Sequence, residues 1–152
     1  MKKPKLVKTD LDKRIAALAS TCDHRLLGIW AADCVERALP YFEEKYAEDF
    51  RPRKAIEALR AWVQTGTFRM TDIRRDSLAA HAAARAVKEQ DNAARSAARA
   101  AGQAVATAHV PTHALGAALY AATAVRDATG SMEDAVKEQE WQYQHLLDLE
   151  GN

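Results

Sequence analysis

The residues best suited to chemistry are two histidines on either side of a proline, in the segment AHVPTHALG over residues 108–116. Two imidazoles four apart on one continuous helix lie on the same side, as in helical zinc sites. Pro111 separates the two, so we expect His109 to end one helix and His113 to begin the next. His81 is the nearest candidate for a third ligand. The spacing predicts a helix corner, and we expect no bound metal and no cofactor.

Two interpretations of this corner stay open. An imidazole in the last turn of a helix interacts favourably with the helix dipole, and one near a helix start can bond exposed backbone groups. These are structural roles. Alternatively, the corner joins two helices of small residues, which leaves room for a cleft that takes a ligand or a partner.

A second polar group lies in WAADCVER, residues 30–37. Arg37 follows Trp30 by two helical turns, so a charge lies on the apolar side of the expected helix. Asp33 precedes Arg37 by four residues, the spacing of a helical ion pair. A charge among apolar residues is costly unless it is paired. The group predicts either a satisfied structural ion pair or one wall of a pocket.

The pocket hypothesis joins both groups in one cleft of a small-molecule-binding or metal-binding domain, with enzymatic activity as an extension. The residues expected to line that cleft are Trp30, Asp33, Arg37, His81, His109, His113 and Tyr120. The sequence contains no GxxxxGK[ST], GxGxxG, HExxH or GxSxG motif and no paired CxxC. No serine or cysteine has a recognisable base partner in sequence. Catalysis by a nucleophile is therefore not favoured.

Further charged residues flank the expected helices. Arg53 and Arg60 lie two turns apart, where they either stay solvated or meet Asp33, Glu36 or an acidic partner. Residues 69–99 offer a further interpretation, a basic stripe whose charge is partly neutralised by nearby acidic residues. Its members are Arg69, Arg74, Arg75, His81, Arg85, Arg95 and Arg99.

Composition excludes several classes of protein. A chain of 152 residues with 48% hydrophobic residues suits one domain. Its 22 Lys and Arg against 21 Asp and Glu give a net charge of +1, so we expect no nucleic-acid partner. Cys22 and Cys34 suit a reduced intracellular protein. MKKPKLVK lacks the apolar core of a secretory signal, and the alanine-rich segment 97–125 is too weakly apolar to span a membrane. We expect a cytoplasmic protein without a membrane partner.

Helices alone must position these residues, because apolar residues recur three and four apart and nothing alternates with period two. The expected helices cover about 10–20, 23–39, 52–66, 71–90, 91–108, 112–130 and 131–149. A short helix or turn over 40–50 should plug the bundle with Tyr41, Phe42, Tyr46 and Phe50. The expected caps are Asp10, Asp23, Thr71 with Asp72, Asp91 or Asn92, Thr112, and Ser131 with Asp134. Pro40 should interrupt the second helix, and Gly66 and Gly130 should end two others.

The predicted fold is all-α, a single globular bundle of about seven antiparallel helices with short connections. The alanine-rich helices should approach one another closely and form the centre. We expect residues 1–9 to be a basic flexible tail, 10–149 to be one helical domain, and 150–152 to fray. An array of helical repeats is a less favoured alternative, because no fixed period is found.

Several segments in order over about residues 20–128 resemble a bacterial family of immunity proteins, the immunity-protein-five-like family. They are DHRLLGIWAADCVERALPYFEEKY, RPRKAIEALRAW, AAHAAAR and AARAAGQAVATAHVPTHALGAALYAA. The resemblance implies an all-α, non-catalytic domain that binds and neutralises a cognate toxin protein. It transfers neither a toxin identity nor catalytic residues.

Aromatic and charged residues dominate the energy of protein interfaces, which suggests where a partner would bind. The candidate partner surface is Tyr41, Glu44, Tyr46, Trp62, Trp141 and Tyr143. A third hypothesis is a structural module that only self-associates as a homo-oligomer.

Overall fold

Eight α-helices account for most of the described chain. The structure is a computed structural model that describes residues 6–151, and these contain no strand. In chain order the helices are α1 (Leu11–Ala19), α2 (His24–Ala38), α3 (Pro40–Glu43), α4 (Arg51–Thr65), α5 (Met70–Ala86), α6 (Asn92–Ala106), α7 (His113–Thr129) and α8 (Met132–Glu150). Each of the seven expected helices has a counterpart, and α3 is the short one. The all-α prediction is confirmed.

Local sequence signals set several helix ends as predicted. The Asp23 carboxylate accepts a hydrogen bond from the Leu26 N–H at 2.7 Å and caps α2. Ser131 Oγ likewise accepts from the Asp134 N–H at 3.1 Å and caps α8. Gly66 and Gly130 end α4 and α7 at φ of 74° and 69°, in the left-handed region that glycine adopts without strain.

Other ends differ from the prediction. Asp10 is not a side-chain cap, because its backbone is already helical; Thr9 Oγ1 accepts from the Leu11 N–H instead. α5 ends at Ala86, before the expected Gln90. α6 ends at Ala106 because the N–H groups of the next three residues bond to carbonyls only three residues back. This tightened turn places His109 outside the helix.

The α6–α7 corner and the segment 40–50 also differ from the prediction in detail. Thr112 precedes α7 without a side-chain cap, since its backbone is helical. In the aromatic segment Phe42 is fully buried, whereas Phe50 is exposed. The plug therefore consists of Phe42 with Tyr41 and Tyr46 packed partly against the core.

Both ends of the described chain are held by contacts with the rest of the molecule. Residues 1–5 of the expected tail lie outside the described residues, but Val7 is only 1% exposed. Its N–H donates to Thr123 Oγ1 on α7 at 3.1 Å. At the other end α8 continues through Glu150. Its carboxylate accepts hydrogen bonds from the Thr21 hydroxyl and the Cys22 thiol.

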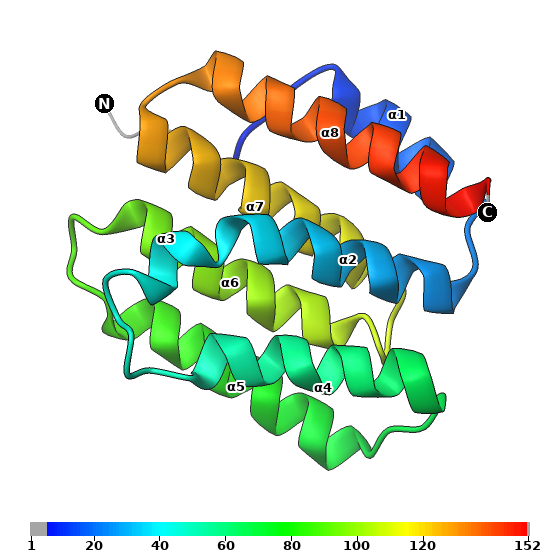
Figure 1. The fold of residues 1–152 in the computed structure, drawn as a ribbon, viewed down its shortest axis with the longest axis horizontal. Coiled ribbons are helices and arrows are strands. Elements are labelled where there is room, and N and C mark those ends of the chain that lie inside the picture. Colours follow the sequence, from blue (N-terminus) through cyan, green and yellow to red (C-terminus); the bar gives the residue numbers. More distant parts are fainter. Residues whose placement is uncertain (1–5, 152) are drawn as a thin grey trace.

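Small residues form the centre of the bundle, as predicted. Figure 1 shows α2 in front of α6 and α7, with α1 and α8 along one edge and α4 and α5 along the other. The buried residues of α6 are alanines with Ser96, Gly102 and Val105, and those of α7 are alanines with Thr123 and Arg126. Short side chains let these two backbones lie close together. Bulky side chains such as Trp30 and Leu59 fill the layer of α2 and α4.

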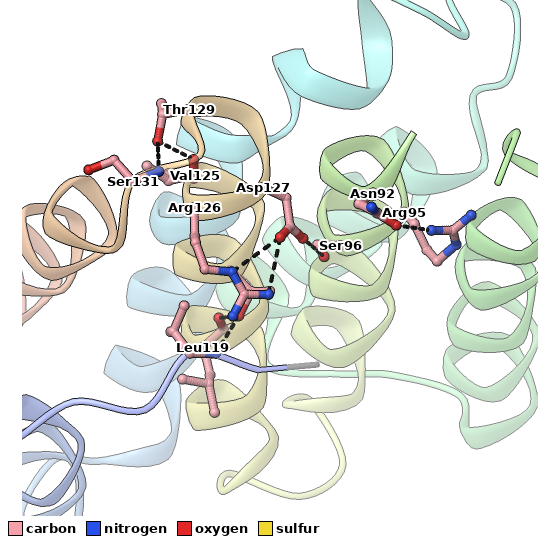
Figure 2. A network of polar contacts seen from close by, with 11 residues as sticks. Asn92, Arg95, Ser96, Leu119, Val125, Arg126, Asp127, Thr129 and Ser131 are labelled. Atoms are coloured by element: carbon pink, nitrogen blue, oxygen red, sulfur yellow. Dashed lines mark hydrogen bonds and ion pairs between the residues drawn. The ribbon is translucent and has the colours of Figure 1, made fainter. Parts of the chain in front are cut away.

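A buried polar contact fastens α6 to α7 near the N-terminal segment. Arg126 pairs with Asp127 at 3.1 Å, and the Asp127 carboxylate accepts from Ser96 Oγ at 3.1 Å. Figure 2 shows Asp127 of α7 between Arg126 and Ser96 of α6. Paired in this way, the charges can stay buried.

Candidate functional site

A groove between α5, α6 and the α6–α7 corner brings together three of the predicted site residues. Its volume is about 230 Å³. The residues that line it are Met70, Ile73, Arg74, Ser77, Leu78, His81, Gly102, Gln103, Ala106, His109 and His113. We call it the histidine groove. Of the seven residues expected to line one cleft, it contains His81, His109 and His113.

Helical spacing and small residues build the groove. Met70, Arg74, Ser77 and His81 follow at intervals of three and four along α5 and therefore share one face. The opposing wall on α6 carries Gly102, which lets the two helices approach. Ser77 Oγ donates to the Gly102 carbonyl at 3.0 Å and holds the helices together.

His81 lies against the backbone of Gly102. A Cβ atom on residue 102 would stand 2.6 Å from His81 Nε2, so only glycine leaves room for the ring. Burial lowers the pKa of His81 below its ordinary value, and the nearby Arg99, Arg85 and His113 lower it further. His81 is therefore a neutral imidazole at neutral pH.

The other two histidines are held differently. His113 Nδ1 lies 2.8 Å from Gln103 Oε1, and because the amide oxygen accepts, Nδ1 is the protonated nitrogen. His109 is exposed, and its ring meets the edge of Phe68 at a centroid distance of 6.3 Å. The groove thus offers imidazoles in three environments.

Apolar side chains at the groove reach into solvent. Leu78 in the lining is 61% exposed, and Phe68 beside His109 is 41% exposed. Large exposed apolar residues next to a hollow are typical of a protein-binding surface. Sequence reasoning did not select either residue. For Leu78 a signal existed, because it shares a helix face with Arg74 and His81.

The groove face is also electropositive. Among residues 6–151, Arg74, Arg85 and Arg99 form no ion pair. The acidic side chains of α5 lie on its other side, where Asp72 and Asp76 pair with Arg75 at 3.3 and 3.2 Å. On one side of α5 the basic residues of the predicted stripe are neutralised by acidic residues. On the side that faces the groove they are not.

The remaining predicted pocket residues lie elsewhere. Trp30 is fully buried, and its Nε1 donates to the Gln142 carbonyl at 2.8 Å. Tyr120 follows His113 by two turns of α7 but does not line the groove. Asp33 and Arg37 also lie outside this lining, so the structure does not bring the two groups together in the histidine groove.

Asp33 and Arg37 do not pair with each other. Asp33 pairs with Arg60 of α4 at 3.0 Å and with His145 of α8 at 2.8 Å. Arg37 pairs with Glu138 of α8 at 2.7 Å. Partners on neighbouring helices are better placed than a partner one turn away, so WAADCVER forms a satisfied structural network.

Neighbouring contacts complete this network. The Arg37 guanidinium lies 4.0 Å from the Trp141 ring centre, and His145 stacks on Trp141 at 4.7 Å. Arg53 binds both Glu36 and Glu43. The contacts of Arg53 and Arg60 with Glu36 and Asp33 were one of the two alternatives expected from sequence.

The predicted partner surface is only partly accessible. Trp62 is 8% exposed and packs on Gly28, so it belongs to the core. Glu44 is exposed, while Tyr41, Tyr46, Trp141 and Tyr143 are half-buried. Tyr46 is held by the Asp91 carboxylate and Tyr143 by Arg14. These aromatics are already engaged within the chain.

Neither cysteine is activated as a nucleophile. Burial, with the Glu150 carboxylate, raises the pKa of Cys22 to about 11. Burial also raises the pKa of Cys34 well above its ordinary value. Both thiols therefore stay protonated at neutral pH.

Between residues 6 and 151, no three His, Cys, Asp or Glu side chains are grouped closely enough to hold a metal ion. The helices of this same region are also too short or too polar to cross a membrane.

Comparison with known protein families shows to which family the chain belongs. The profile of a family described as "Imm-5 like putative immunity protein" matches residues 17–149. The chain belongs to this family. No match is found among curated proteins or among solved structures. The Imm-5 like region contains every residue of the histidine groove, and the resemblance seen in the sequence is confirmed.

Proposed function

We propose that the chain is a non-catalytic immunity protein that neutralises a cognate toxin by binding it through the histidine groove. Membership of the Imm-5 like family supports this proposal. The observation that carries it is the combination of exposed Leu78 and Phe68 with the Arg74 side chain at one groove. Protein interfaces are built from such apolar and arginine anchors.

The charge of the groove suggests what the toxin presents. Arg74, Arg85 and Arg99 lack ion-pair partners within the described chain, so they are available to carboxylates of another protein. Apolar Leu78 and Phe68 suit an apolar side chain between those carboxylates. We propose that the toxin contributes a segment of acidic and apolar residues, and that binding blocks its active site in the cytoplasm of the producing cell.

Affinity capture and growth protection test the function together. The tagged chain is used to capture proteins from the source bacterium, and each captured protein is expressed alone in a susceptible strain. We expect one of them to arrest growth and the co-expressed chain to restore it. If no captured protein is toxic, or if co-expression never restores growth, the proposed function is wrong.

Matched variants then test the surface. Leu78→Asp places a charge on an exposed groove residue and should abolish protection, whereas Leu147→Asp, at a position 38% exposed on α8, should keep it. Arg74→Glu should weaken toxin binding at least tenfold, more strongly at low salt. Equal protection by both leucine variants would assign the toxin to another face of the molecule.

A further inference from the structure

A second cleft lies under α1, between this helix, α7 and α8. Its volume is about 150 Å³. The residues that line it, from α1, α7 and α8, are Asp12, Ile15, Ala16, Leu115, Ala118, Leu119, Gln139 and Gln142. None of them lines the histidine groove. Figure 1 shows α1 and α8 along the edge opposite α5.

One buried polar atom at this cleft has no partner. The side chain of Gln142 is fully buried, and its Nε2 donates to the Ala118 carbonyl at 2.9 Å. This bond identifies the amide nitrogen, because two facing oxygens would repel each other. Gln142 Oε1 then remains without a hydrogen-bond partner among the described residues. A buried acceptor of this kind is destabilising until a donor reaches it.

The other polar groups of the cleft are already satisfied. Asp12 Oδ1 accepts from Gln139 Nε2 at 2.7 Å, and Asp12 Oδ2 accepts from the Thr9 N–H at 3.1 Å. Gln139 Oε1 accepts from the Thr9 hydroxyl. The lining contains no basic side chain, so an anionic head group would meet only the Asp12 carboxylate. A molecule in the cleft must therefore bring a donor.

The remaining walls of the cleft are apolar, and a neighbouring cleft shares two of their residues. This larger space, about 460 Å³, shares Ala16 and Leu115 with the first and lies between α1 and the start of α7. Its other lining residues are Ala19, Ser20, Cys22, Leu27, Pro111, Thr112 and Ala114. Ala16 and Leu115 therefore offer an apolar surface for an alkyl chain.

We propose that the space under α1 binds a small amphiphile whose head donates a hydrogen bond to Gln142 Oε1 and whose alkyl chain lies against Ala16 and Leu115. A primary alcohol and a primary amine share this chemistry. A single ordered water fits less well, because buried waters usually need two to four polar partners, and Gln142 Oε1 is the only buried side-chain N or O atom among residues 6–151 that lacks one. This site is independent of toxin binding.

Titration of the full chain with three molecules of equal length tests the proposal. Hexan-1-ol and hexan-1-amine carry a donor, and methyl pentyl ether does not; amide chemical shifts around Gln142 and Ala118 report binding. We expect the alcohol to bind at least tenfold more tightly than the ether. Tighter, salt-sensitive binding of the amine would identify the ammonium form as preferred, through the charge of Asp12.

Variants separate the hydrogen bond from the apolar walls. Gln142→Met removes the acceptor at similar size and should make alcohol and ether bind equally. Ala118→Leu fills the first cleft and should weaken the alcohol at least tenfold, whereas Ala17→Leu, at an exposed position of α1, should not. Equal affinity of alcohol and ether for the natural chain, or no binding of either, would overturn the proposal. Because the alcohol-to-ether ratio is measured within each folded variant, a change in stability does not mimic the result.

Discussion

The imidazole of His81 rests on the backbone of Gly102, where a Cβ atom would lie 2.6 Å from Nε2 and 2.8 Å from Cδ2. Helices α5 and α6 meet at this contact, and both residues line the histidine groove. Gly116 on α7 stands in a similar relation to Gln103, 2.9 Å from Oε1, but there the obstructing atom ends a flexible side chain.

We predict that Gly102→Ala destabilises the fold by about 1–2 kcal/mol, because the ring must be displaced by the new methyl group. The displaced ring gains solvent, so the pKa of His81 should rise toward its ordinary value. Thermal unfolding and an NMR titration of the His81 ring measure the two effects. The double variant His81→Ala/Gly102→Ala is the control, because without the ring the three nearest obstructing atoms at residue 102 are gone and alanine favours the helix. A pKa of His81 that is unchanged in Gly102→Ala would show that the ring does not rest on residue 102.

The lowered pKa of His81 makes the stability depend on pH. Below about pH 6.5 the unfolded chain takes up a proton at this residue that the folded chain resists, so the unfolded state binds more protons. Stability is therefore fully present above pH 6.5 and should fall as the pH drops through the window toward the lowered pKa. Urea unfolding at several pH values measures this slope.

His81→Asn is the control for that pH dependence, since asparagine does not titrate. The difference between the natural chain and the variant therefore reports residue 81 together with its coupling to His113. Identical slopes in the two proteins would contradict the assignment.

The α2–α8 network allows a prediction about a buried charge. Glu138 has a side chain only 10% exposed, and Arg37 covers it with bonds of 2.7 and 3.1 Å. Arg37→Ala should destabilise the fold by about 1–2 kcal/mol, because the carboxylate is left unpaired and Trp141 loses its cation. Chemical denaturation checks the value. Lys137→Ala, which removes an exposed ion pair at 3.9 Å, should change stability by less than about 0.5 kcal/mol.

The features set by short-range sequence signals could be predicted best. Caps such as Asp23, helix-ending glycines and three-and-four periodicity act over a few residues, so the helices were predictable. The burial of the alanine tracts was predictable for the same reason. Which helices would be neighbours was not, because similar apolar faces can pair in several arrangements. Asp33 and Arg37 consequently met partners on α4 and α8 rather than each other.

Local sequence signals likewise predicted the histidines of the candidate site but not its apolar residues. His81, His109 and His113 were selected as unusual polar residues among small ones, and the structure gathers them. Leu78 and Phe68 were not selected, since single apolar residues on a helix or loop give no local sign of their exposure. Cavities such as the one beside Gln142 depend on how several helices fit, which no short pattern encodes.

The N-terminal segment supplies the last prediction. Val7 is buried, and the only hydrogen bond of its N–H within the described chain goes to Thr123 Oγ1. Thr123→Val keeps the shape but removes the acceptor, so the buried N–H is left unsatisfied at a cost of about 1 kcal/mol or more. The amide of Val7 should then exchange with solvent at least several-fold faster in a hydrogen-exchange experiment. Thr129→Val is the matched control, because Thr129 makes the same bond to the carbonyl four residues back but is exposed. Rapid exchange of Val7 already in the natural chain would mean that this segment is not docked on α7.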